Sequence, residues 1–241
     1  MKSLVLSAAA VLGAASALPA PQSDPIRILP SWWKFDIIAL RGPGCPDFNT
    51  TAVYSTRPTY GSNTVDGSEI YYWHFAYPHM KASVGRDASE TSTWCETTLK
   101  YSELKDREGK ELSGDYRLKL HKNGTEVLAT YDLEEGVTAK WKFTYYPEDM
   151  DEVVDEITVN GPYNTSAYGE IVQSPVRKNS ERWALPKCGA GTIKYKTQLK
   201  VTAKKQGAKG TVSSEAVEYK GEKGLYGVQQ GVSYDWEKCA K

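Results

Sequence analysis

Hydrophobic and polar residues alternate along most of this chain with a period of two, the pattern of a β-strand with one buried face. The clearest runs are 137–145 and 193–201, where apolar residues alternate with lysine, threonine and glutamine. Run 115–131 is expected to fold as a hairpin, because Asn123-Gly124 is a strong two-residue turn signal. Further strand candidates are 33–40, 69–77, 94–101, 153–159, 167–172, 211–219 and 231–236.

These short strands are separated by polar turns rich in glycine, proline and asparagine, and no window of a dozen residues carries a helical stripe. Regularly spaced short strands of this kind predict two packed antiparallel sheets. The expected fold is therefore an all-β, antiparallel β-sandwich of jelly-roll or immunoglobulin-like type, with little helix. No linker-like stretch divides residues 31–241, so they are expected to form one domain.

The first residues have the organisation of a secretory signal. A basic start is followed by an uncharged apolar stretch and by Ala15-Ser16-Ala17, which predicts a signal peptide over 1–17 with cleavage after Ala17 or Ala20. The apolar stretch of about twelve residues is shorter than a bilayer-spanning helix. Residues 18–30 are expected to form a Pro-rich mobile leader. We expect a secreted, extracellular monomer without a membrane or lipid anchor.

Four cysteines follow the signal, with no Cys-x-x-Cys pair, so disulfides are expected in an oxidising compartment. Of the three possible connectivities, the favoured one keeps each loop of about 50 residues within one half of the chain. It pairs Cys45 with Cys95 and Cys188 with Cys239. Three Asn-x-Ser/Thr sequons predict N-glycosylation at Asn49, Asn123 and Asn164.

The chain has 30 basic and 30 acidic side chains, which argues against a nucleic-acid-binding protein. Its aromatic residues are mainly tyrosine and tryptophan, with 16 Tyr and 7 Trp against 4 Phe. Alternating aromatics at 71, 73, 75 and 77 are expected to face the core. Tyr72 and Trp32 fall outside that pattern and are the aromatic candidates for stacking on a sugar ring.

Basic residues recur on the polar faces of three predicted strands. If these strands are neighbours, their basic face could attract an acidic polysaccharide or an anionic surface. The alternative is that outward lysines protect the sheets from edge-to-edge pairing. The residues are Arg117, Lys119, Lys140, Lys142, Lys194, Lys196 and Lys200.

No motif with strong spacing constraints for catalysis or for phosphate or metal binding is present. His74 and His79 could bring two imidazoles together but have no obvious third metal ligand. The acidic run 148–152, continued by Asp155 and Glu156, offers carboxylates for calcium, yet its spacing matches no known calcium loop and favours a solvated loop. We therefore expect no catalytic residue, no bound metal and no cofactor.

Several motifs occur in an order seen in a secreted, mainly fungal family. They are Gly42-Pro-Gly-Cys45-Pro46, Trp94-Cys95-Glu-Thr-Thr-Leu-Lys-Tyr101, the stretch Tyr131–Tyr146, Asn160-Gly161-Pro162, Pro186-Lys-Cys188-Gly189 and Trp236-Glu-Lys-Cys239. Over nearly the whole mature chain the sequence resembles the "domain of unknown function 4360" family. The resemblance implies a β-rich secreted domain with two disulfides and supplies no catalytic residues.

The expected function is that of a non-catalytic extracellular protein. Its surface would contact a polysaccharide or protein at the cell wall or at a host interface. The Tyr and Trp excess supports an alternative, a carbohydrate-binding module. A secreted hydrolase is the remaining alternative, and it would need converging carboxylates in a cleft.

Overall fold

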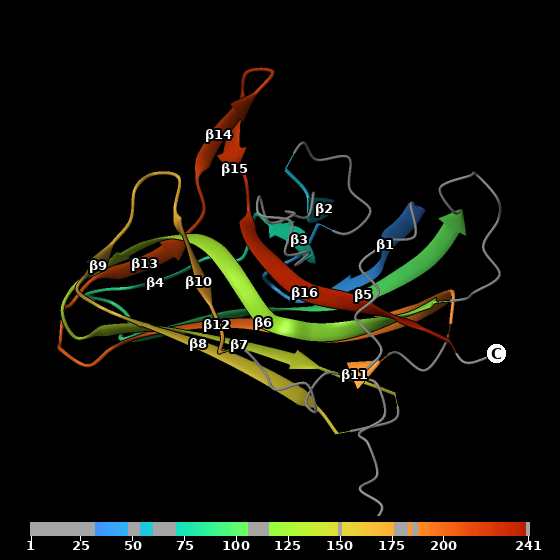
Figure 1. Cartoon of the computed structure of the whole chain (residues 1–241). Helices are drawn as coiled ribbons and strands as arrows, with labels where there is room; N and C mark the ends of the chain where they lie inside the picture. Colours follow the sequence, from blue (N-terminus) through green and yellow to red (C-terminus); the bar gives the residue numbers. More distant parts are fainter. Residues whose placement is uncertain are drawn as a thin grey trace, which may run out of the picture.

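A computed structural model describes residues 32–47, 54–59, 71–105, 116–148, 151–175, 183–184 and 188–239. Throughout these ranges the chain forms strands, turns and irregular segments, and no helix in them is long or apolar enough to cross a membrane. The predicted signal peptide (1–17) and leader (18–30) lie outside the described residues. The fold is all-β and antiparallel, as the alternating pattern predicted (Figure 1).

Five strands form the first sheet, in the order β1-β5-β12-β7-β8. Most of them coincide with runs of period-two alternation. Residues 137–145 form a strand with the bounds predicted for it, because each inward apolar side chain is followed by an outward polar one. The strands are β1 (Trp32–Arg41), β5 (Glu90–Lys105), β12 (Ala190–Ala203), β7 (Val137–Tyr145) and β8 (Val153–Asn160).

The second sheet has nine strands, six of them in the order β2-β3-β16-β6-β13-β4. Its remaining strands β9, β10 and β11 all pair with β6. The bounds are β2 (Arg57–Thr59), β3 (Tyr71–Tyr77), β16 (Val228–Lys238), β6 (Tyr116–Leu133), β13 (Gly210–Ser213), β4 (Ala82–Val84), β9 (Tyr163–Asn164), β10 (Glu170–Gln173) and β11 (Trp183–Ala184).

Two strands of the nine-stranded sheet lie end to end beside β6. Ser213 of β13 pairs with Thr130, and Gln229 of β16 pairs with Leu128, two positions away on β6. The hairpin between them, formed by β14 (Ala216–Tyr219) and β15 (Glu222–Leu225), therefore interrupts what would otherwise be one strand. This hairpin projects away from the two sheets (Figure 1).

The core lies between the inner faces of the two sheets. Trp141 and Phe143 of β7 stack with nearly parallel rings. Phe75 and Tyr77 of β3, with less than 2% exposure, contact Tyr195 of β12 from the other sheet. The predicted inward orientation of positions 75 and 77 is thus confirmed. The side chains of Tyr71 and Trp73 lie outside the described residues.

Buried polar side chains link the two sheets through the core. The hydroxyls of Tyr77 on β3 and Tyr195 on β12 are 2.8 Å apart. Thr125 of β6 donates to Asp155 of β8 at 2.7 Å, so its contact with Tyr145 requires the tyrosine to donate. Burial raises the pKa of Tyr77 to about 12 and the pKa values of Tyr145 and Tyr195 well above the usual range.

Both favoured disulfides are confirmed. Cys45, which follows β1, is bonded to Cys95 on β5, and their Cα atoms are 5.6 Å apart. Cys188, before β12, is bonded to Cys239, after β16, with a Cα separation of 6.4 Å. The first bridge ties a loop to the five-stranded sheet, and the second ties the ends of strands from different sheets. Disulfides of this kind indicate an oxidising compartment.

The predicted hairpin at Asn123-Gly124 is wrong. Strand β6 runs as one element of 18 residues through this dipeptide. Val232 of β16 pairs with Thr125, and Tyr234 pairs with Leu120, so Ser233 alone lies opposite residues 121–124. The dipeptide therefore lies in a bulge of β6, which Gly124 accommodates with a φ of 79°.

Candidate functional site

The predicted basic face is divided between the two sheets. The lysines at 140 and 142 on β7 and at 194, 196 and 200 on β12 belong to the five-stranded sheet, whereas Arg117 and Lys119 lie on β6. Three of the five lysines of the first group form ion pairs with glutamates. The ion pairs are Lys140–Glu156 at 2.9 Å, Lys196–Glu96 at 3.8 Å and Lys200–Glu90 at 2.9 Å. The seven residues therefore do not form one basic surface.

The aromatic candidates have different outcomes. Trp32 begins β1, and its side chain lies outside the described residues. Tyr72 lies on the outer face of the nine-stranded sheet but is only 7% exposed. Its ring stacks beside that of His74, with 6.2 Å between centroids and 10° between planes. Tyr72 is therefore a member of a packed polar cluster and offers little free ring surface to a sugar.

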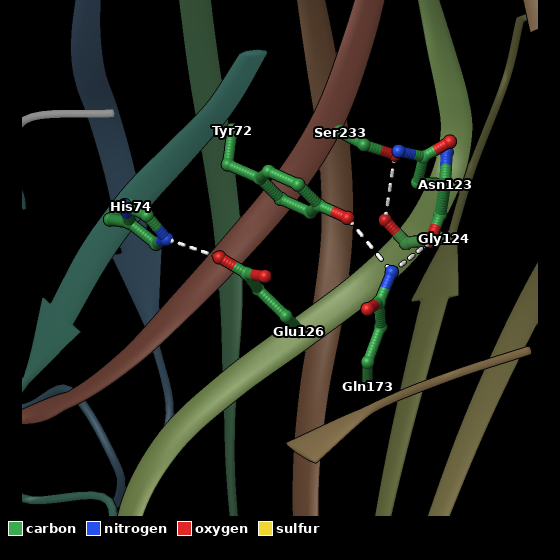
Figure 2. A network of polar contacts seen from close by, with 7 residues as sticks. All are labelled: Tyr72, His74, Asn123, Gly124, Glu126, Gln173 and Ser233. Carbon is green, nitrogen blue, oxygen red and sulfur yellow. Dashed lines mark hydrogen bonds and ion pairs between the residues drawn. The ribbon is translucent and has the colours of Figure 1, made fainter. Parts of the chain in front are cut away.

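Figure 2 shows this cluster on β3, β16, β6 and β10. The Gln173 side-chain amide donates to the Tyr72 hydroxyl at 2.8 Å and to the carbonyl of Asn123 at 2.7 Å. Burial, and then the charge of Glu126, raise the pKa of Tyr72 to about 12, while the Asn123 side chain opposes this shift. The phenol is therefore neutral at physiological pH.

His74 and Glu126 meet across the intervening strand β16. His74 Nε2 and Glu126 Oε1 are 2.6 Å apart, with 14% and 10% of the side chains exposed. Gly231 lies between them, paired with both residues. A Cβ at position 231 would lie 2.6 Å from Glu126 Cγ and 2.7 Å from the His74 ring. The contact between His74 and Glu126 therefore requires glycine at position 231.

Two serines hold the bulge of β6. Ser233 Oγ accepts the N–H of Asn123 at 2.7 Å and donates to the carbonyl of Gly124 at 2.8 Å. Ser174, which follows β10, accepts the N–H of Thr125 at 3.0 Å through its own hydroxyl. These contacts satisfy main-chain groups that the bulge removes from the strand ladder. The polar cluster in Figure 2 therefore stabilises the bulge of β6 within the nine-stranded sheet.

An open groove of about 280 Å³ lies further along the outer face of the nine-stranded sheet. Outward residues of β6, β9 and β13 form it together with the loop after β9 and the base of the β14–β15 hairpin. Asp132 and Asn164 pair across β6 and β9. The lining residues are Thr130, Tyr131, Asp132, Asn164, Thr165, Ser166, Ala167, Thr211, Ser214 and Ala216.

The groove presents hydroxyl, amide and carboxylate groups. The Asn164 amide donates to Asp132 at 3.1 Å, and the Thr165 hydroxyl accepts the N–H of Tyr131 at 3.0 Å. Among the described lining residues, Asp132 alone carries a charged side chain. Tyr168, next in sequence to the lining residue Ala167, is 78% exposed. A polar groove whose last lining residue on this loop is followed by an exposed tyrosine can bind a molecule that has both hydroxyl groups and apolar faces.

The acidic run separates into side chains with different surroundings. Asp155 is buried and accepts a hydrogen bond from Thr125, while Glu156 pairs with Lys140 on the outer face of the five-stranded sheet. His74 contacts Glu126, and His79 is exposed in the turn after β3. Within the part of the chain that the structure describes, no group of three His, Cys, Asp or Glu side chains could hold a metal ion.

The sequence does not predict most of the groove. It marks Asn164 only as part of a sequon and Asp132 only as part of the stretch Tyr131–Tyr146. Both lie at outward positions of strands, a signal that the period-two pattern contains for many other polar residues. What distinguishes them is that β6, β9 and β13 are neighbours, which is a property of the sheet order.

Comparisons with known proteins leave the family open. No family model matches the chain, and no curated protein matches it. Among solved structures, the carbohydrate-binding module TmCBM61, solved in complex with beta-1,4-galactotriose, aligns over 87% of this chain and 90% of its own, with 13% identity. The TM-score of 0.17 is too low to support an inference about fold or ligand.

Proposed function

We propose that this chain is an extracellular, non-catalytic protein that binds neutral glycans in the groove between β6, β9 and β13. A role at a cell wall or host surface and a relationship to the "domain of unknown function 4360" family fit this proposal. The observation that carries it is the chemistry of the groove, in which hydroxyls, an amide and one carboxylate gather on one sheet face, and an exposed tyrosine follows the lining residue Ala167.

The side chains match the hydrogen-bonding needs of a sugar. Carboxylates accept hydrogen bonds from hydroxyls more strongly than neutral acceptors do, and asparagine can both donate and accept. Asp132 and Asn164 supply these two kinds of group within 3.1 Å of each other. The ring of Tyr168 could cover the apolar face of a sugar held there.

The charge of the groove favours a neutral ligand. A polyanion would be repelled by Asp132, and none of the basic residues expected to attract one lines the groove. Five of these residues are on the other sheet, where glutamates pair with three of them, and Arg117 and Lys119 lie on β6 outside the groove lining. The groove volume of about 280 Å³ is near the lower end for small-molecule sites, which suits a short segment of a glycan.

Calorimetric titration of unglycosylated full-length protein with neutral oligosaccharides tests the proposal, with oligogalacturonate as an acidic comparison. We expect binding of at least one neutral series, a loss of tenfold or more in affinity in Asp132→Ala, and a smaller loss in Tyr168→Ala. Tyr219→Ala is the matched control, because Tyr219 is also exposed but lies on the β14–β15 hairpin outside the groove lining. The absence of binding to any neutral glycan at millimolar concentration would contradict the proposal.

A further inference from the structure

One of the three sequons lies inside the groove. Asn164, Thr165 and Ser166 form an Asn-x-Ser sequon, and all three residues line the groove wall. We infer that Asn164 carries an N-linked glycan whose first sugars occupy the groove, so that glycosylation closes the proposed ligand site. This inference rests on the proposed function, because it concerns the control of the same groove.

Asn164 is well placed for a glycan in the folded protein. It is exposed on the two-residue strand β9, where the Thr165 N–H donates to the Tyr131 carbonyl at 2.9 Å and fixes the backbone. The atom that would carry the sugar, Asn164 Nδ2, donates to Asp132 Oδ1 at 3.1 Å. The glycan therefore begins at a groove wall, beside the carboxylate proposed to bind ligand.

Asn123 is in a different position. Its N–H is held by Ser233 and its carbonyl by Gln173, and its side chain acts on the Tyr72 hydroxyl within the polar cluster. A glycan on that amide would start inside the cluster of Figure 2 and compete with these contacts. We therefore expect Asn123 to be unmodified in the folded, secreted protein. Asn49 lies outside the described residues.

The modification requires a lipid-linked oligosaccharide diphosphate as the glycosyl donor. Asn164 Nδ2 forms a bond to the anomeric carbon of the donor, the bond from that carbon to the lipid diphosphate breaks, and the diphosphate leaves with the electron pair. The nitrogen transfers one of its two protons to a base of the glycosyltransferase and keeps the other. The remaining N–H can still donate to Asp132, so the linkage is compatible with the observed side-chain contact.

A tethered glycan has a large advantage over a free one. Its local concentration at the groove is in the millimolar range for a short tether. A tethered glycan that binds the groove with a dissociation constant of about 0.1 mM or lower would then occupy it in roughly nine molecules of ten, and a free oligosaccharide would have to displace it. Glycosylated protein should bind neutral oligosaccharides at least tenfold more weakly than unglycosylated protein.

The same sequence made in two hosts gives a matched test that leaves every groove residue in place, including Ser166, whose Oγ accepts the N–H of Tyr168 at 3.3 Å. Both samples carry Asn49→Gln, so that this sequon adds no glycan. One sample is secreted from a glycosylating host and the other is made in the bacterial periplasm, and the two are compared by glycopeptide mapping and by titration with the same neutral oligosaccharide. We expect a glycan at Asn164 in the first sample only, and tenfold weaker binding in that sample.

The outcomes separate the two ideas. If Asn164 is unmodified, or if glycosylated and unglycosylated proteins bind equally, the inference is wrong and the proposed function stands. If no form binds, the proposed function fails, and the inference is decided without ligand by the rate at which an endoglycosidase trims the Asn164 glycan. A seated glycan is trimmed at least tenfold more slowly in native protein than after denaturation, and faster in native Asp132→Ala. Equal trimming rates in native and denatured protein would show that the Asn164 glycan does not occupy the groove.

Discussion

The two outer faces of this sandwich are built from similar residues and differ in how their strands are paired. On the five-stranded sheet, β12 pairs with β5 and β7 without a register shift, and two of its lysines pair with glutamates of β5; the register shifts of this sheet lie at its edge, between β1 and β5. On the nine-stranded sheet, β6 contains a bulge, and the β14–β15 hairpin separates β13 from β16. We call the outer face of the first sheet the regular face and that of the second the interrupted face. Three lysines of the regular face have glutamate partners, whereas the interrupted face contains the polar cluster and the groove.

The comparison shows what interruptions of a sheet provide. A regular ladder consumes every main-chain hydrogen-bonding group and leaves outward side chains to pair with each other. A bulge frees main-chain groups, which must find side-chain partners such as Ser233 and Ser174. The inserted β14–β15 hairpin projects from the sheet, and its base contributes Ser214 and Ala216 to the groove lining. Candidate sites accordingly gather on the interrupted face.

The largest expected change in the free energy of unfolding comes from ionising the buried tyrosines between the two sheets, which both outer faces depend on. The pKa of Tyr77 is raised by burial to about 12 from an ordinary value of 10.0, so the folded state retains this proton more strongly than the unfolded state. Its stabilising contribution is complete below pH 10 and is lost as the pH rises through 12, by about 3 kcal/mol. Chemical denaturation between pH 8 and 12, with tyrosinate absorbance, should show this loss. Tyr77→Phe should reduce the slope of stability against pH in this range by about one proton, because Tyr72, Tyr145 and Tyr195 still have raised pKa values, and Tyr219→Phe should leave the slope unchanged.

The next effect concerns the bulge on the interrupted face. Ser233→Ala removes the partner of the Asn123 N–H and of the Gly124 carbonyl, and the serine is fully buried. We expect a loss of about 2 kcal/mol in the free energy of unfolding, because two buried main-chain groups lose a partner. Urea denaturation checks this value. Ser92→Ala, at an exposed position of β5 on the regular face, is the control, and equal losses in the two variants would contradict the comparison.

A smaller loss of stability is expected when Gly231 is replaced. Gly231→Ala puts a methyl group within 2.7 Å of His74 and Glu126, so these side chains must separate. We expect a loss of about 1.5 kcal/mol. The double variant His74→Ala/Gly231→Ala should lose less than the sum of its single changes, because the alanine at 74 leaves room for the methyl group. Additive losses would mean that the His74–Glu126 contact does not limit the residue at 231.

The smallest effect is expected on the regular face. Lys140 and Glu156 are 2.9 Å apart, and both side chains are 45% exposed. Water and salt screen such a pair, so Lys140→Ala should change the free energy of unfolding by about 0.5 kcal/mol or less. The same denaturation series measures it. A loss as large as that of Ser233→Ala would show that the regular face depends on specific side-chain contacts as the interrupted face does.

The sequence predicted the fold class, most strands and both disulfides, because local alternation and cysteine count report local structure and compartment. The sequence-based prediction was wrong where pairing between strands far apart in the sequence determines the structure. Asn123-Gly124 has the left-handed glycine of a turn, and the bulge uses the same backbone conformation; only the pairing of β6 with β16, more than 100 residues later, distinguishes the two.

The candidate site could not be predicted from the sequence, because it also depends on which strands are neighbours in the sheet. Arg117 and Lys119 alternate in the same way as Lys194 and Lys196, yet they lie in different sheets. Asp132 became a site residue because Asn164 and Thr211 are its neighbours on either side. Neither fact follows from a single period-two strand, since the period specifies which side chains share a face and leaves the neighbouring strand unspecified.

Backbone amide shifts of unglycosylated protein from the bacterial periplasm, recorded during titration with a neutral oligosaccharide, would locate the ligand on the surface. We expect shifts concentrated at residues 130–132, 164–168 and 211–216, with none at 194–200 on the regular face. Shifts centred on 194–200, or larger shifts with an acidic oligosaccharide than with a neutral one, would contradict this expectation.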